Sequence, residues 1–270
     1  MNFEPKRNEP QFNLGRVDEI LLSDGAQFET MGFDAQAPVL GLLSRREQRN
    51  TQALISRLEG NPHFQAPRED DLAAPYGSYL GRHVIGFGTR IQGGVYMGRK
   101  PREAIVVDAT SKVVRRLHYK LRLQLLIFTA QHLWTRRGSI DRGQIQREQL
   151  KFIMRFVQRT LVFDNHAVTA LIEFYGAKHD VKLSLNAFIE ARVGVCRHQV
   201  CLYGVLVELL QEDGLLGGKV SVQRARFARF SHAWVRFTSQ WGQVYIIDPA
   251  QDRFANLSEM GEMEREFYSI

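Results

Sequence analysis

The sequence contains little cysteine and no long apolar run. Cys196 and Cys201 are its only cysteines in 270 residues, which argues against a disulfide framework. On one helix they would lie roughly 140° apart, so we expect two free thiols, as suits a reducing cytosol. No stretch approaches the roughly 18 apolar residues of a membrane span. The first residues, MNFEPKRNEPQFN, lack the apolar stretch of a secretory signal peptide.

Nucleotide-binding and metal-binding patterns are also missing. The glycine-rich segment GFGTRIQGG (86–94) matches neither the dinucleotide-binding pattern G-x-G-x-x-G nor the P-loop pattern G-x-x-x-x-G-K. We interpret it as part of a short hairpin over residues 83–98. Cys196, Cys201 and His198 do not have the spacing of a standard zinc site. We therefore expect neither a metal nor a cofactor.

The composition is that of a globular protein with a basic surface. Hydrophobic residues make up 44% and charged residues 24% of the chain, with a net charge of +7. The charge favours an acidic protein as substrate. A basic cluster opens a predicted helix and is interpreted as a solvated face, with an acidic partner or a membrane surface as the alternative. We expect no nucleic acid, because aromatic residues are not interleaved with the cluster as base stacking requires. The cluster comprises Lys112, Arg115, Arg116, Lys120 and Arg122.

Three parts follow one another along the chain. Residues 1–38 are polar and contain three prolines, so we expect a flexible arm. Residues 39–110 form an N-terminal extension with one helix and the glycine-rich hairpin. Residues 111–270 are expected to form the main domain.

The hydrophobic periodicity changes along the main domain. Spacings of three and four predict helices first, and alternating segments predict strands after Gly218. This order indicates an α+β fold with a largely antiparallel sheet. The predicted helices cover 40–60, 111–138, 141–161, 167–176, 183–194 and Cys196 to about residue 211; the predicted strands cover 219–227, 232–237 and 243–248.

Three residues in this arrangement suggest nucleophilic chemistry. Cys196 begins the most apolar helix, where unpaired N–H groups and the helix dipole lower the pKa of a thiol. His232 starts a strand and is suited to activate the thiol and to protonate a leaving group. Asp248 ends the next strand and is suited to orient the imidazole. The alternative for each residue is structural, since a cysteine in an apolar helix is usually a core residue, as we expect for Cys201.

The hairpin between the two strands decides whether His232 and Asp248 share a face. If they are directly opposite, Thr238 pairs with Gly242 and the loop is Ser239–Trp241, a common three-residue length. A two-residue turn would place them on opposite faces.

The blocks GVCRHQVCLYGVLVELL (194–210), SHAWVRF (231–237) and WGQVYIIDPAQD (241–252) together resemble the transglutaminase-like superfamily, a branch of the papain-like fold. The resemblance covers roughly residues 183–250 and implies Cys196 as nucleophile, His232 as general base and acid, and Asp248 as orienting residue. It also implies that Trp234, with Arg197 and His198, lines the substrate cleft. The backbone N–H of Cys196 is one candidate donor to the oxyanion of such a reaction. A second donor is not identified; Asn186, Arg192 and Gln199 are the nearest candidates in sequence.

The resemblance implies a mechanism more narrowly than a substrate. Modification of protein glutamine, by deamidation or transamidation, is the leading hypothesis. A cysteine protease or amidase with the same triad is the second, and a non-catalytic binding module that retains the fold is the third. Because some toxins and effectors of this superfamily act inside host cells, we expect the chain in a cytosol, either its own or that of a host.

Overall fold

A computed structural model of the chain describes residues 45–68, 71–98, 103–135, 141–176, 181–226 and 231–268. The arm expected over residues 1–38 lies outside these residues. All described residues belong to one structural unit, residues 36–270.

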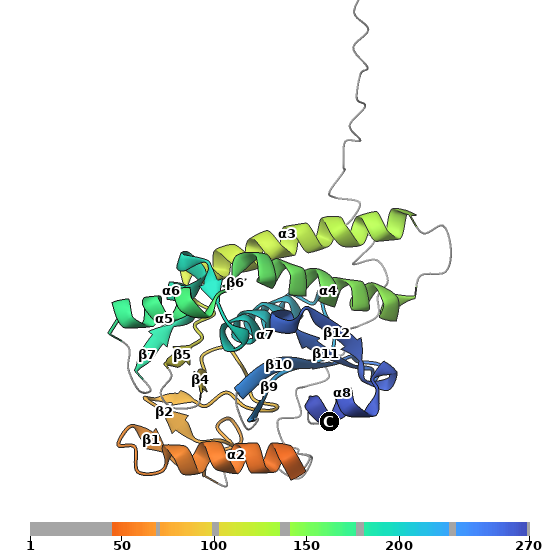
Figure 1. Cartoon of the computed structure of the whole chain (residues 1–270). Coiled ribbons are helices and arrows are strands. Elements are labelled where there is room, and N and C mark those ends of the chain that lie inside the picture. The colour runs from red at the N-terminus through yellow and green to blue at the C-terminus, as the bar shows by residue number, and fades with distance from the viewer. Residues whose placement is uncertain are drawn as a thin grey trace, which may run out of the picture. The chain divides into compact units, whose positions relative to one another are not determined.

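Helix α7 (Cys196–Glu212) is the centre of the core. Apolar residues surround it on nearly every side, which is typical of a fully buried helix. Helices α3 (Lys112–Thr135) and α4 (Arg142–Thr160) cover one side of α7, and a four-stranded sheet covers the other (Figure 1). The prediction of a central helix that begins at Cys196 is confirmed.

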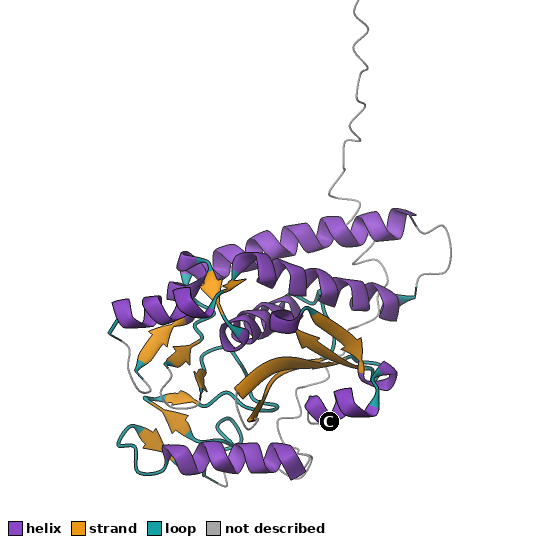
Figure 2. Ribbon diagram, viewed as in Figure 1, coloured by secondary structure: helices purple, strands orange, loops and turns teal. Residues whose placement is uncertain are grey.

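The sheet consists of β9 (Lys219–Arg226), β10 (Ser231–Thr238), β11 (Val244–Asp248) and β12 (Arg253–Asn256). Its order is β12-β11-β10-β9 and all neighbours are antiparallel (Figure 2). The expected α+β class is therefore confirmed. One face packs on α7; the other carries a smaller apolar cluster that includes Trp234 and Tyr268, the latter directly after the C-terminal helix α8 (Glu262–Phe267).

The register between β10 and β11 differs from the predicted one. Thr238 faces Val244 instead of Gly242, so the connection is the five-residue loop 239–243. Ser239 organises this loop, because its hydroxyl accepts hydrogen bonds from the backbone N–H groups of Trp241 and Gln243. The shift is by two residues, so side chains keep their faces and the predicted shared face of His232 and Asp248 survives.

The predicted hairpin over residues 83–98 is wrong. β3 (Arg82–His83) pairs with β2 (Ser78–Tyr79), whereas β4 (Val95–Met97) pairs with β5 (Ala104–Val106) in another sheet. The segment between β3 and β4 is anchored on α7 instead. Its backbone N–H groups at Ile91 and Gln92 donate to the Glu208 carboxylate, at 2.7 and 2.9 Å. A side-chain carboxylate thus satisfies two backbone N–H groups of this segment.

Residues before and after 110 share one core. Ile85, Ile91 and Ile105 pack in the same apolar cluster as α7, and β5 pairs in parallel with β7 (Lys182–Ser184). The expected boundary at residue 110 therefore does not separate two packed bodies. The remaining elements are α2 (Arg45–Leu58), β1 (Phe64–Gln65), β6 (Val162–Phe163), α5 (Asn165–Phe174), α6 (Leu185–Ala191), β8 (Val193–Gly194) and the short 3-10 helices η2 (Pro249–Gln251) and η3 (Leu257–Glu259).

Over the described ranges, we find no helix with the length and apolar character needed to cross a bilayer.

Candidate functional site

The first turn of α7 presents the Cys196 thiol. Val195 is extended and forms the N-cap, and its backbone N–H donates to Nδ1 of His198 at 3.1 Å. This bond satisfies one N–H at the helix entrance and fixes where the helix begins. Cys196 is half-buried and accessible, whereas Cys201 is fully buried. The two thiols therefore occupy different environments, as the sequence predicted.

Cys196, His232 and Asp248 form a continuous chain of hydrogen bonds. The Cys196 thiol is hydrogen-bonded to the His232 ring and to the backbone N–H of Ala233. Nε2 of His232 lies 2.5 Å from Oδ2 of Asp248, which leaves Nδ1 to contact the sulfur. Extending the observed register places Asp248 opposite Trp234, so the carboxylate reaches the imidazole diagonally across the two strands.

Asp248 is held by more donors than the sequence suggested. Its side chain is fully buried. Oδ2 accepts from the Tyr268 hydroxyl at 3.1 Å as well as from His232, and Oδ1 accepts from the backbone N–H of Gln251 at 3.2 Å. Tyr268 was missed by sequence reasoning, and the aromatic pair Phe267-Tyr268 near the chain end was the only available signal. Three donors fix the position of the carboxylate beside the imidazole.

The electrostatics of the pair favour an activated thiol. Burial by itself would raise the pKa of Cys196, but the hydrogen bond and the charge of His232, with Arg197 and the Ala233 N–H, lower it below its ordinary value. For His232, burial opposes the charged form, yet the bonds to Asp248 and Cys196 raise the pKa to about 9. Burial raises the pKa of Cys201 to about 12. Only Cys196 is therefore disposed to ionise near neutral pH.

Arg197 and His198 do not line an open cleft as expected. Both are buried and contact Glu103, which directly precedes β5. The Arg197 guanidinium donates to both Glu103 oxygens, at 2.5 and 3.1 Å, and Nε2 of His198 lies 2.9 Å from the same carboxylate. Sequence reasoning missed Glu103, because nothing near residue 103 predicts a partner 94 positions away. The three residues anchor the N-terminus of α7 to β5. The positive charge of Arg197 also helps to lower the pKa of the Cys196 thiol.

Trp234 also differs from its expected role as a cleft wall. Its side chain is fully buried, and its Nε1 donates to Oε1 of Gln223 at 3.0 Å. Its ring is nearly parallel to His232, with centroids 6.1 Å apart, and meets Tyr268 edge-on at 5.4 Å. Together with Phe267, whose ring centroid is 5.9 Å from that of His232, these aromatic rings pack beside the imidazole and limit its movement.

Residues that flank the glycine-rich segment lie close to the site. The Arg224 guanidinium stacks over the Tyr96 ring at 4.1 Å and donates to the carbonyl oxygens of Ile85 and Met97. Burial raises the pKa of Tyr96 to about 12, and the Tyr96 hydroxyl is close enough to Cys196 to be influenced by its charge. Arg224 thus ties the segment before β5 to the sheet that carries His232.

The expected oxyanion candidates have other partners. Nε2 of Gln199 donates to the Leu161 carbonyl at 2.8 Å, and Oδ1 of Asn186 accepts from the Ser111 hydroxyl at 3.0 Å. Arg192 ends α6 in a left-handed conformation at an exposed position. The backbone N–H of Cys196 therefore remains the candidate donor.

Within the residues that the structure describes, no three His, Cys, Asp or Glu side chains gather closely enough to hold a metal ion. No protein-family model, curated protein or solved structure matches the chain. The likeness to the transglutaminase-like superfamily therefore stays a prediction from three sequence blocks.

Proposed function

We propose that the protein is a cysteine-dependent acyl-transfer enzyme of the papain-like, transglutaminase-like kind, which acts on the carboxamide of protein glutamine. One observation carries the proposal. A half-buried thiol at a helix N-terminus is hydrogen-bonded to an imidazole, whose other nitrogen meets a fully buried carboxylate. This is the constellation that activates a cysteine nucleophile.

In the first half-reaction, the Cys196 thiolate attacks the carboxamide carbon, and the π electrons of the C=O bond move to its oxygen. The backbone N–H of Cys196 is the candidate donor for that negative charge. The His232 imidazolium then donates its Nδ1 proton to the departing nitrogen. Ammonia leaves, and the acyl group remains on sulfur as a thioester.

In the second half-reaction, the now neutral His232 removes a proton from the acceptor as it attacks the thioester carbonyl. Water as acceptor yields glutamate, and a lysine amine yields an isopeptide bond. The thiolate leaves, and the His232–Cys196 ion pair is restored. Throughout, Asp248 keeps a proton on Nε2 and stabilises the imidazolium.

The lowered pKa of the thiol distinguishes this proposal from a binding module. A module that only retains the fold needs no ionised sulfur, and a buried apolar neighbourhood would raise the pKa, as it does for Cys201. Cys196 is half-buried and hydrogen-bonded to His232 instead.

The test compares the wild type with Cys196→Ala on an unfolded, glutamine-rich acceptor protein, with and without a fluorescent primary amine. We expect the wild type alone to raise the acceptor mass by about 1 Da per glutamine, or to incorporate the amine. Cys201→Ala is the matched control and should retain activity. Cut acceptor chains would replace the glutamine assignment by a protease, and equal behaviour of wild type and Cys196→Ala would refute Cys196 chemistry altogether.

A further inference from the structure

The outward side of α3 carries a stripe of exposed apolar side chains. Tyr119, Leu123, Ile127 and Trp134 are 61%, 42%, 48% and 88% exposed. Their spacings of four, four and seven residues place all four within about 80° of the helix circumference. The core side of α3 is distinct and contains Val114, Leu121 and Leu125, all buried. The exposed stripe is therefore an additional surface, separate from the side that packs on α4 and α7.

The same helix is strongly basic toward its N-terminus. Its first eleven residues carry five exposed Lys or Arg side chains, and none of its 24 residues is Asp or Glu. At one flank, Asp213, after α7, forms an ion pair with Arg122 at 3.5 Å and lies 3.0 Å from Nε2 of His118, a ring whose pKa is lowered by burial. The first half of α3 thus carries all five cations together with Tyr119 and Leu123, whereas the second half carries Ile127 and Trp134 and contains no Lys or Arg. The five basic residues are Lys112, Arg115, Arg116, Lys120 and Arg122.

We propose that the outer face of α3 binds the surface of an anionic lipid bilayer. A helix that lies along such a surface places cations among acidic head groups and apolar side chains at the acyl boundary. Tyr119 and Trp134 carry amphipathic rings, which favour that boundary. The contact is peripheral and does not involve a membrane span.

The charge distribution argues against a second copy of the chain as occupant. In antiparallel pairing, the basic half of one α3 would lie on the apolar half of the other. In parallel pairing, the two basic halves would face each other and repel. A bilayer surface meets both halves at once, because it supplies acidic groups and an apolar layer along its whole extent.

This inference is independent of the proposed function. The Cys196 sulfur lies on the sheet side of α7, since it is bonded to His232 and Ala233 of β10, whereas α3 packs on the other side (Figure 1). A bilayer on the outer face of α3 would therefore leave the sulfur uncovered. Binding would concentrate the protein at that membrane surface.

The electrostatic part of the proposal is tested in a flotation assay with the full chain. Two vesicle preparations are compared, phosphatidylcholine alone and phosphatidylcholine with about 30% phosphatidylserine. We expect binding to the anionic vesicles only, weakening as salt rises. Each basic residue near an anionic membrane contributes about fivefold in affinity, so Lys112→Gln/Arg116→Gln should bind about thirtyfold more weakly. The matched control is Arg68→Gln/Lys182→Gln, which removes two exposed charges elsewhere and should bind like the wild type.

Contact of the apolar side chains with the acyl boundary is tested by tryptophan fluorescence. The chain has three tryptophans; Trp234 is buried, so Trp241→Phe leaves Trp134 as the exposed one. Anionic vesicles should shift its emission to the blue, and Trp134→Phe in the same background should abolish the shift. Absence of vesicle binding, equal binding to neutral vesicles, or loss only in the Arg68/Lys182 control would overturn the proposal. The proposal would also be overturned if the α3 variants disrupted self-association of the chain, or a complex with an acidic protein, while the wild type did not bind vesicles.

Discussion

Two cysteines five positions apart have opposite surroundings in this protein. Cys196 lies in the first turn of α7 with His232 and the Ala233 N–H beside it. Cys201 lies one and a half turns further, fully enclosed by apolar side chains. A helix turns by 100° per residue, so the two side chains leave the axis in different directions. Burial and a charged partner then shift their pKa values in opposite senses.

This contrast predicts selective alkylation. Iodoacetamide should label Cys196 in the folded chain, with a rate that rises with pH through a pKa below the ordinary value of about 8.5 and then levels off. Cys201, with its pKa raised to about 12, should react only after unfolding. Mass spectrometry of peptides labelled between pH 5 and 9 measures the labelling rates of the two thiols. Equal and slow labelling of the two thiols would contradict an activated Cys196.

Asp248→Asn tests the orienting residue. An amide lacks the negative charge that stabilises the imidazolium, and it can accept fewer hydrogen bonds than the three that Asp248 accepts. We expect turnover to fall by about 10²–10⁴-fold. The pKa of His232 should fall from about 9 toward its ordinary value, which titration by NMR would measure.

Asp252 serves as the matched control for that variant. It is exposed, accepts a hydrogen bond from Nε2 of Gln158 at 3.0 Å and lies away from the imidazole contact. Asp252→Asn should therefore leave turnover unchanged. Near-normal activity of Asp248→Asn with loss in Asp252→Asn would reverse the assignment.

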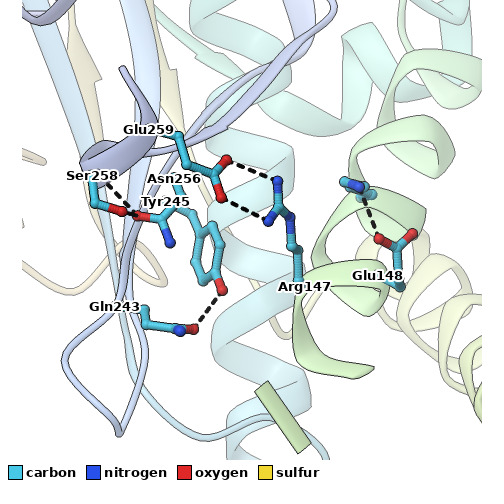
Figure 3. Close-up of polar contacts among 8 residues, drawn as sticks. Arg147, Glu148, Gln243, Tyr245, Asn256, Ser258 and Glu259 are labelled. Atoms are coloured by element: carbon cyan, nitrogen blue, oxygen red, sulfur yellow. Dashed lines mark hydrogen bonds and ion pairs between the residues drawn. The ribbon is translucent and has the colours of Figure 1, made fainter. Parts of the chain in front are cut away.

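At the scale of elements, a buried ion pair joins β5 to the start of α7. Burial alone would raise the pKa of Glu103, but the contacts with His198 and Arg197 lower it to about 2. A surface counterpart exists between α4 and η3, where Arg147 and Glu259 form a bidentate pair with both distances 3.0 Å (Figure 3). Its partners are 33% and 51% exposed. The two pairs have the same chemistry in different solvent environments.

Glu103→Gln should therefore destabilise the fold far more than Glu259→Gln. Glu103→Gln leaves the Arg197 charge buried without its partner, which should lower the free energy of unfolding by on the order of 3 kcal/mol. Glu259→Gln should lower it by about 1 kcal/mol or less. The pKa of Glu103 is lower in the folded than in the unfolded chain, so the stability that its ionised carboxylate contributes is complete above about pH 5. The gap between wild type and Glu103→Gln should narrow as pH falls from there toward about 2. Urea unfolding of both variants across this range measures it, and equal losses at neutral pH would contradict the buried-anchor role.

At the scale of the whole molecule, the site joins segments from most of the described chain. The helix entrance is anchored by Glu103, the proposed nucleophile is Cys196, and the carboxylate of Asp248, the proposed orienting residue, is held by Tyr268 near the C-terminus. The glycine-rich segment is bound to α7 by Glu208, and Ile85, directly before it, is bound to β9 by Arg224. The geometry at the sulfur therefore depends on contacts between elements, and no single segment would form it alone.

The local and periodic features of the fold could be predicted from the sequence. It predicted α7 and its first residue, the strands that carry His232 and Asp248, and their shared face, because helix and strand periods and side-chain alternation are properties of neighbouring residues. The α+β order followed from the same periodicity.

Tertiary structure alone decided the partners of those residues. It paired Arg197 and His198 with Glu103, buried Trp234, brought Tyr268 to Asp248 and replaced the hairpin at 83–98 with a loop held by Glu208. The physical reason is that a buried charge or unpaired N–H must find a partner, and the partner can come from anywhere in the chain that folding brings near. Sequence spacing records the period of an element but not the distance in space between residues far apart in the chain.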